Sequence, residues 1–408
     1  MTPLNLRDAR SDPANLVDRA TARMDPAVAP DAATLRLREV HRAVAELRRG
    51  TPVLLTGGSL TRGGALVVLP AETAGARGLA EFNGLAAGAP VLLLAPVRAA
   101  AVLRRPVAPS APAMALRTSP ALLHQAVLLG LADPTAEQML PEELALAAEC
   151  PALAPAALAL AKLARLLPAV LAAPAHDNAA ARAATLHLMC VSADAVLAYP
   201  AGIAEGLRRV AEVPVPLDGA PDARLVAFRA PDSGIEHLAI LIGRPEDGEE
   251  DVAEGGCAPL ARVHSECFTG DLLGSLRCDC GPQLRGAIQR MAHEGAGVLL
   301  YLAQEGREIG LMNKLRAYAM QDRGMDTLDA NRALGWGADE RNFLIAATML
   351  EELGIHSIRL LTNNPAKVAA LQACGLRSVT REPHAFEPNG VNNHYLATKA
   401  VRFGHLLG

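Results

Sequence analysis

Short apolar segments alternate with helical patterns along most of this chain, and this alternation constrains the fold more than any other feature of the sequence. In the first half, PVLLT (52–56), ALVVLP (65–70) and PVLLLA (90–95) each have the length of one buried strand. In the second half, GVLLYL (297–302) and SIRLLT (357–362) repeat the pattern next to helical stretches. Strands that alternate with helices predict an α/β fold with mixed α+β layers.

Apolar positions three and four residues apart predict the helices. In the first half we expect a helix over 39–50, with Gly50 as its stop, and an Ala/Leu helical region broken by prolines over 141–175. In the second half we expect helices over 284–294, 309–322, 339–353 and 365–374. The helix at 309–322 would turn Ile309, Met312, Leu315 and Met320 inward.

The two halves of the chain differ in composition. Only Phe82 and Tyr199, of eleven aromatic residues, lie within residues 1–222. The segment VPVPLDGAPDA (213–223) carries prolines that oppose both a helix and a central strand. The sequence therefore predicts two domains, with a mobile arm at 1–35, a first domain at 36–212, a linker at 213–223 and a second domain at 224–408.

Composition excludes several classes of protein. A chain of 408 residues with 51% apolar residues can bury a large core, and a net charge of −4 excludes a generally basic nucleic-acid binder. Seven cysteines are too few for a disulfide scaffold. The apolar stretch 118–132 is too short to span a membrane, and the charged N-terminus lacks the apolar core of a signal peptide. We therefore expect a cytoplasmic protein that binds neither membrane nor nucleic acid.

A cysteine cluster is the strongest chemical signal. Cys267, Cys278 and Cys280 follow a C-x10-C-x-C pattern. Soft thiolates favour zinc, and three protein ligands leave one position open, as in catalytic zinc sites. His264 could instead be a fourth ligand, which would give a closed structural site, and three buried thiols without metal are the simplest alternative.

Polar residues around this cluster indicate a phosphorylated substrate. Arg262, Glu266, Arg277, Asp279 and Gln283 lie close to the cysteines in sequence. The segments QEGREIGL (304–311), GADER (337–341) and LTNNPAK (361–367) place charged residues after a strand or at an expected helix N-terminus. Each segment alone could be a surface ion pair, but together they favour metal-assisted hydrolysis.

Five motifs resemble GTP cyclohydrolase II in their order and spacing. They are ARVHSECFTGDLLGSLRCDCGPQL, LAQEGREIGLMNKLRAYAMQDRG, GWGADERNF, LLTNNPAKV and YLATKAVRFGHLL, and the resemblance covers roughly residues 258–408. It implies ring opening of GTP by a zinc-activated water, with release of formate, pyrophosphate and a phosphoribosylamino-diaminopyrimidinone, as the first step of riboflavin biosynthesis. It also implies a homodimer, and Mg²⁺ bound with the triphosphate.

The resemblance also assigns roles to residues. It implies that Cys267, Cys278 and Cys280 hold zinc, that Asp339 accepts a proton, that Tyr318 belongs to the catalytic site and that Arg341 attacks the α-phosphorus. The positions that match GTP contacts are Arg262, Val263, His264, Ser265, Glu266, Gln283, Glu305, Gly306, Arg307, Thr327, Thr362 and Lys367. Chemistry alone favours a different role for Arg341, because a guanidinium is a poor nucleophile and a good phosphate clamp.

The sequence departs from the family pattern at a few positions. Leu302 and Ala303 stand where His-Arg is expected, Glu308 replaces a common Asn, and EPNGVNNHYL (387–396) is rearranged. None of these changes removes a proposed ligand or catalytic residue. They leave open a cyclohydrolase paralogue that serves another pathway, such as pyrimidine catabolism or secondary metabolism, and a non-catalytic GTP-binding regulatory protein.

The first half resembles a degenerate 3,4-dihydroxy-2-butanone-4-phosphate synthase. VHRAVAELRRGTPVLLTGGSLTRGGALVVLPAET and VSADAVLAYPAG (191–202) resemble the opening and closing segments of that enzyme. The loop TGGSLTRGGA (56–65) has no carboxylate where the synthase carries an acidic magnesium-binding loop, and no counterpart of its RPGH segment is found. The resemblance therefore implies a structural role for this half. The alternative is an unrelated Ala-rich α/β domain.

Overall fold

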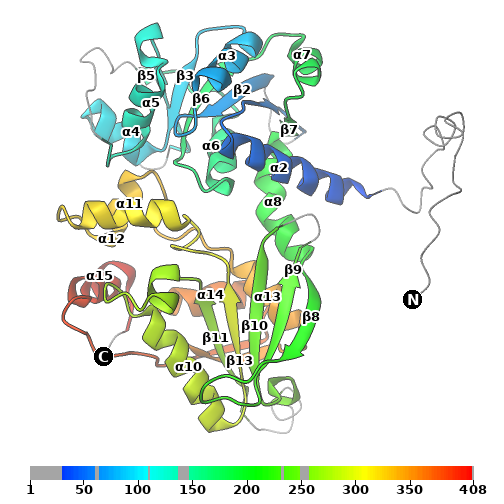
Figure 1. Cartoon of the computed structure of the whole chain (residues 1–408), viewed down its shortest axis with the longest axis vertical. Coiled ribbons are helices and arrows are strands. Elements are labelled where there is room, and N and C mark those ends of the chain that lie inside the picture. The colour runs from blue at the N-terminus through cyan, green and yellow to red at the C-terminus, as the bar shows by residue number, and fades with distance from the viewer. Residues whose placement is uncertain are drawn as a thin grey trace, which may run out of the picture.

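The computed structural model describes residues 30–59, 64–108, 111–136, 147–230, 234–248 and 257–406. Residues 1–29 of the expected arm, and 60–63 of the loop at 56–65, lie outside these ranges. The described chain forms two seven-stranded sheets, one in each half, with helices packed on them (Figure 1). The expectation of a mixed α/β fold with two domains is confirmed.

The first sheet has the strand order β5-β4-β3-β6-β2-β1-β7. Its strands are β1 (Val53–Thr56), β2 (Ala65–Pro70), β3 (Val91–Leu94), β4 (Met114–Arg117), β5 (Ala147–Ala148), β6 (Ala169–Pro174) and β7 (Cys190–Ser192). All neighbouring strands are antiparallel except β1 and β7. The prediction of a helical region over 141–175 is wrong for β6, which is a central strand. A short apolar run between prolines has the same composition in a buried helix and in a buried strand.

Helices cover both faces of the first sheet. They are α2 (Ala32–Arg48), α3 (Ala76–Leu85), α4 (Pro96–Leu103), η1 (Pro120–Leu122), α5 (Gln125–Ala132), α6 (Ala154–Leu163), α7 (Ala179–Thr185) and α8 (Ala193–Glu205). Alternation along β1 sends Leu54 into one core and Val53 and Leu55 into the other. The helix expected from residue 39 begins at Ala32, where Asp31 caps it, so residues 32–35 of the expected arm are helical.

The second sheet has the order β14-β13-β11-β12-β10-β9-β8. Its strands are β8 (Arg208–Pro214), β9 (Arg224–Arg229), β10 (Glu236–Ile242), β11 (Leu260–Ser265), β12 (Gly297–Leu302), β13 (Ser357–Leu361) and β14 (Ser378–Glu382). Because β8 already pairs with β9, the segment expected as a linker at 213–223 joins two strands of one sheet. The chain passes between the halves at 206–207, and Pro214 is tolerated because β8 is an edge strand.

The helices of the second half are η2 (Pro245–Asp247), the π-helical turn η3 (Phe268–Leu272), α10 (Cys280–Glu294), α11 (Leu311–Gln321), α12 (Thr327–Ala333), α13 (Phe343–Glu352), α14 (Pro365–Ala373) and α15 (Asn393–Phe403). The helix expected at 339–353 begins only at Phe343, because Asn342 caps it by accepting from the Leu344 amide. Asn364 and Pro365 open α14 as expected. No helix in the described part of the chain is long and apolar enough to cross a membrane.

Helices α11 and α12 lie between the two sheets and complete the core of the first domain (Figure 1). Their apolar side chains join the cluster that contains Phe82, Leu92 and Leu171, and the members they contribute are Ala317, Met320 and Ala330. Two residues expected to face inward are exposed instead: Met312 is 62% exposed and Leu315 is 44% exposed. The buried face of α11 carries Asn313 and Lys314, which have polar partners.

Candidate active site

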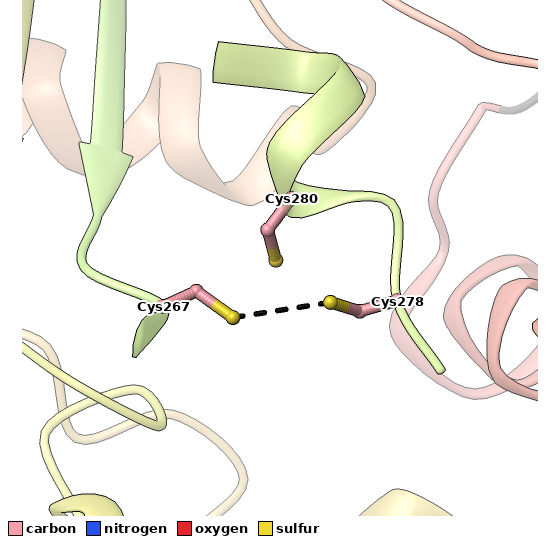
Figure 2. Close-up of side chains that lie close together, drawn as sticks. All are labelled: Cys267, Cys278 and Cys280. Carbon is pink, nitrogen blue, oxygen red and sulfur yellow. Dashed lines mark hydrogen bonds between the residues drawn. The ribbon is translucent and has the colours of Figure 1, made fainter. Parts of the chain in front are cut away.

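Three thiols converge at the carboxyl end of β11. Cys267 follows this strand, and Cys278 and Cys280 stand before and at the first turn of α10. Their sulfur atoms lie within 4.8 Å of one another, and the Cys267 and Cys278 sulfurs are 3.8 Å apart. Figure 2 shows the three side chains pointing toward one point. Among the described residues, this is the one group of His, Cys, Asp and Glu donors that could hold a metal.

Gly270 leaves the space that the sulfurs occupy. A Cβ at this position would lie 2.7 Å from the Cys278 sulfur and 3.0 Å from the Cys267 sulfur. The Gly270 amide also donates to Cys267 Sγ at 3.3 Å. Three soft donors that meet over a glycine fit zinc, which prefers thiolates and tetrahedral coordination.

Protonation of the thiols is uneven. Hydrogen bonds from Cys278 and Cys280, with a further one from Lys314, hold the pKa of Cys267 far below its ordinary value. The contact with Cys267 raises the pKa of Cys278 to about 11, and contacts with Cys267 and Cys278 raise the pKa of Cys280 well above its ordinary value. These contacts favour the thiolate form at Cys267, whose sulfur lies 3.0 Å from the ammonium nitrogen of Lys314.

Lys314 links the thiols to the opposite wall. Its Nζ lies 3.0 Å from Cys267 Sγ and donates to Glu305 Oε1 at 2.7 Å. Burial lowers the pKa of this lysine, but the hydrogen bonds to Cys267 and Glu305 outweigh it and the net shift is upward. Lys314 was not singled out from the sequence, because the expected inward face contained Met312 and Leu315, which are exposed, and not Lys314, which is buried.

His264 is not a fourth member of the thiol group. Its Nε2 lies 3.1 Å from both carboxylate oxygens of Asp271, which also accepts from the Cys267 amide and from Tyr301. Burial lowers the pKa of His264, and the Asp271 hydrogen bond opposes this shift. The Nδ1 atom of His264 is buried and has no partner among the described residues. The alternative of a closed site with three cysteines and one histidine is therefore not what the structure contains.

Buried cations line the cavity next to the thiols. Arg262 donates to the Leu361 carbonyl at 2.7 Å and to Gln283, and burial lowers its pKa to about 10. Lys367, at the N-terminal turn of α14, donates to the Val263 carbonyl at 2.9 Å. Burial, with Arg341 and Arg262 nearby, lowers the pKa of Lys367 well below its ordinary value. An added anion would offset the mutual repulsion of these charges.

The segment 337–341 precedes α13 and does not start it. Arg341 lines the cavity, and its Nε donates to Asp339 Oδ1 at 2.7 Å. Asp339 itself does not line the cavity. Burial raises the pKa of Asp339, but the Arg341 hydrogen bond and charge outweigh it and the net shift is downward.

The turn between β12 and α11 supplies the facing wall. Glu305 accepts from the Phe268 amide at 2.7 Å and from Lys314, which ties this turn to the thiol segment. Arg307 donates to the Ala338 carbonyl at 3.1 Å and lies 4.1 Å above the Phe403 ring. Tyr318 of α11 completes the wall, with its hydroxyl 3.5 Å from the Thr269 hydroxyl.

The structure brings together nearly all residues expected at the site. Those that line the one cavity are Cys267, Cys278, Cys280, Tyr318, Arg341, Arg262, Val263, His264, Ser265, Glu266, Gln283, Glu305, Gly306, Arg307, Thr327, Thr362 and Lys367. Asp339 lies behind Arg341. The cavity is also lined by Lys314, Asn363, Asn364, Tyr395, Lys399 and His405, which the sequence reading missed.

Comparisons with known proteins agree with this site. A family model described as GTP cyclohydrolase II matches residues 208–383. A protein named GTP cyclohydrolase-2 from Azospirillum brasilense is 47% identical over 377 residues, which cover 91% of this chain and 94% of the relative. Proteins of the same name from Actinobacillus succinogenes and Yersinia pestis are 48% and 51% identical; each match covers 49% of this chain, and 88% and 98% of those proteins.

Solved structures give weaker likenesses. A two-domain 3,4-dihydroxy-2-butanone 4-phosphate synthase from A. baumannii matches with a TM-score of 0.32 and 16% identity, over 84% of this chain and 99% of the other. A 3,4-dihydroxy-2-butanone 4-phosphate synthase in a cation-free form matches with a TM-score of 0.30 and 16% identity, over 39% and 94%. At these scores neither likeness carries an argument about the first half.

Proposed function

The chain belongs to the GTP cyclohydrolase II family, and from this membership we propose that it opens the imidazole ring of GTP in a zinc-dependent hydrolysis that releases formate and pyrophosphate. One observation carries the proposal: three converging thiols lie at one end of a cavity whose other walls carry buried cations. Zinc held by Cys267, Cys278 and Cys280 would supply Lewis acidity for hydrolysis of a carbon–nitrogen bond. The cationic walls would hold the triphosphate.

The chain's own residues divide the remaining tasks. Arg307, Arg341 and Lys367 would bind phosphate oxygens, together with the N-terminal end of α14. Arg262 and Gln283, which hydrogen-bond each other, would fix the nucleotide at the wall beside the thiols. Tyr318 offers a hydroxyl with a raised pKa, so it would act as a hydrogen-bond donor near neutral pH; burial is the main cause of that shift.

Asp339 and Arg341 act as a pair in this proposal. The guanidinium holds the carboxylate ionised, so Asp339 would accept a proton only after Arg341 turns toward phosphate. This supports the role of Arg341 as a phosphate clamp. Mg²⁺ would be bound by the triphosphate, because the described residues offer no group of three carboxylate or histidine donors for it.

A product assay tests the proposal. Purified protein is supplied with GTP, Mg²⁺ and zinc, and formate, pyrophosphate and the diaminopyrimidine are measured together. Appearance of all three supports the proposed reaction. Formate without pyrophosphate would retain ring opening and remove pyrophosphate release from the proposed reaction. GTP binding without formate from zinc-loaded protein would favour the non-catalytic alternative.

The pathway is tested separately. We propose that the product feeds riboflavin synthesis. We also propose that the protein is a homodimer, and that the first half is a synthase-like domain without synthase activity. A genetic experiment tests the pathway proposal. Expression of the chain in a riboflavin auxotroph that lacks its own cyclohydrolase should restore growth. An active enzyme that fails to restore growth would point to a paralogue of another pathway.

A further inference from the structure

The turn that carries Glu305, Gly306 and Arg307 has an energetically unfavourable backbone conformation. We call residues 303–310, between β12 and α11, the substrate turn. Gly306 and Gly310 have φ of +64° and +84°, and Arg307 and Glu308 have φ of +63° and +80° without being glycine. Side-chain-bearing residues rarely adopt this conformation, so surrounding contacts must hold it.

Arg165 of the first domain makes those contacts. It lies between α6 and β6, and its Nη2 donates to the Ala303 carbonyl at 2.7 Å and lies 3.3 Å from Glu308 Oε1. Its own carbonyl accepts from Asn313 Nδ2 at 3.1 Å, just after the substrate turn. A Cβ at Gly310 would lie 3.1 Å from Arg165 Cδ, so the turn packs directly on this side chain.

Further polar contacts fix the same region to the first domain. Arg316 of α11 donates to Glu72 and pairs with Asp133, both at 2.8 Å. Glu72 also accepts from the Leu167 amide, two residues after Arg165. Lys162 pairs with Glu340, beside Asp339 and Arg341. Among these contacts between the two halves, the one from Arg165 to the Ala303 carbonyl ends on the main chain of the substrate turn.

We propose that Arg165 is a positioning residue, through which the first domain holds the substrate turn in the conformation that binds GTP. This inference rests on the proposed function, since it takes Glu305–Arg307 as GTP contacts. It gives the first domain a task in the cyclohydrolase reaction although its 56–65 loop carries no carboxylate. It also explains Glu308, a departure from the family pattern, as the partner of Arg165.

The test compares Arg165→Met, Arg165→Lys and the control Arg77→Met. Arg77 is an exposed residue of the first domain that pairs with Glu81. Affinity for a non-hydrolysable GTP analogue should fall about tenfold in Arg165→Met, because a half-buried hydrogen bond from a charged donor is lost. A single nitrogen of Arg165, Nη2, contacts both the Ala303 carbonyl and Glu308. Because lysine also offers one cationic nitrogen, Arg165→Lys should bind the analogue more tightly than Arg165→Met does. The zinc content of all three variants should match that of the wild type. The control Arg77→Met should also bind the analogue like the wild type.

Hydrogen exchange supplies a readout that does not depend on turnover. The amides of Glu308 and Gly310 donate to the carbonyls of Gln304 and Glu305, and these amides should exchange faster in Arg165→Met. Emission from Trp336, the single tryptophan, should stay unchanged and confirm that the domains remain packed. A variant with wild-type analogue affinity and wild-type exchange in the substrate turn would overturn the proposal.

A second variant keeps the test decisive if Arg165→Met fails to fold. Glu308→Gln removes the charge partner from the second domain and should weaken analogue binding in the same direction. Where both variants fold, Glu308→Gln should have a smaller effect in the Arg165→Met background than in the wild type. Equal effects in both backgrounds would contradict a shared contact. If wild-type protein releases no formate from GTP, the proposed function fails, and the exchange result still decides whether Arg165 holds the turn.

Discussion

At the scale of single residues, the thiol cluster depends on an absent side chain as well as on its sulfurs. Gly270 sits where any Cβ would crowd two of the three sulfur atoms. Its φ is not in the left-handed region, so space and not backbone conformation requires glycine here. Alanine at this position tests the metal site without changing a ligand.

Gly270→Ala should weaken zinc binding by at least about tenfold, because the sulfur atoms must move apart. Competition against a chromogenic chelator measures this. Gly84→Ala is the matched control, since a Cβ there meets nothing within 4 Å, and it should bind zinc like the wild type. Wild-type zinc affinity in Gly270→Ala would show that the sulfurs have another arrangement.

Cys278→Ser should abolish both stoichiometric zinc and formate release, because serine is a poor zinc ligand compared with thiolate. Metal analysis and the product assay measure the two effects on one preparation. Cys374→Ser, which changes a half-buried thiol outside the cluster, should retain both. Turnover that survives the loss of zinc would remove the metal from the proposed reaction.

The sequence predicted most individual site residues and missed those whose roles depend on distant partners. The three cysteines have a distinctive spacing, and the structure does bring their sulfurs together. Lys314 is buried only because Cys267 and Glu305, which come from two other segments, surround its ammonium group. Helical periodicity carries no information about such partners.

At the scale of elements, a histidine of β10 that must be neutral binds the residue that follows β12. The Ala303 amide, which opens the substrate turn, donates to His237 Nδ1 at 3.1 Å. Burial, with Arg165 nearby, lowers the pKa of His237 to about 4. A protonated ring nitrogen cannot accept this hydrogen bond.

His237 should therefore make stability depend on pH. The folded-state pKa of His237 lies below the ordinary 6.5. The contribution of the neutral ring to the free energy of unfolding is therefore complete above about pH 6.5 and is lost as pH falls toward 4. Urea unfolding should show about 2 kcal/mol more loss between pH 7 and pH 5 in the wild type than in His237→Gln, whose amide oxygen accepts without titrating. Equal losses in the two proteins would contradict a neutral buried histidine.

The buried face of α11 can be tested with two methionines. Met320 is 2% exposed and Met312 is 62% exposed. Met320→Ala should lower the free energy of unfolding by about 2–5 kcal/mol, and Met312→Ala by less than about 0.5 kcal/mol. Denaturant titration measures both, and equally large losses would restore the inward face expected from the sequence, which included both methionines.

Elements were predicted best where local signals agreed. The Asn364-Pro365 start of α14 combines a side-chain cap with a residue fixed for the first helical turn. The start of α13 was placed four residues early because GADER contains no local stop, and Asp339 is bound to Arg341 instead of capping the helix. Strand β6 was missed because its central position is decided by pairing with β2 and β3.

At the scale of the whole molecule, the two halves share one hydrophobic core. Trp336 of the second half is 3% exposed and belongs to the cluster built around Phe82 and Leu171. Neither half of the sequence indicates this contact, because it joins residues far apart in the chain and each apolar pattern is compatible with an independent domain. The boundary expected at 213–223 was misplaced for a related reason, since strand pairing by β8 is a long-range property.

A chain limited to residues 207–408 should expose this part of the core. Emission from its single tryptophan, Trp336, should shift to longer wavelength because water replaces the first domain around the indole. Adding residues 30–206 as a separate chain should shift the emission back. Emission that matches the full-length protein in the truncated chain would mean that the second half covers Trp336 by itself.

The shared core also sets an order of events during synthesis. The ribosome completes the first sheet and its helices by residue 206, yet the cluster around Phe82 lacks its last members until Trp336 is made. Residue 206 and Trp336 are separated by roughly 130 residues, and synthesis proceeds at about 5–20 residues per second. The first domain is therefore complete on the order of ten seconds before the second half can cover its apolar face. We therefore expect the nascent chain to bind chaperones during this interval, and the speed of translation across this segment to affect the yield of folded protein.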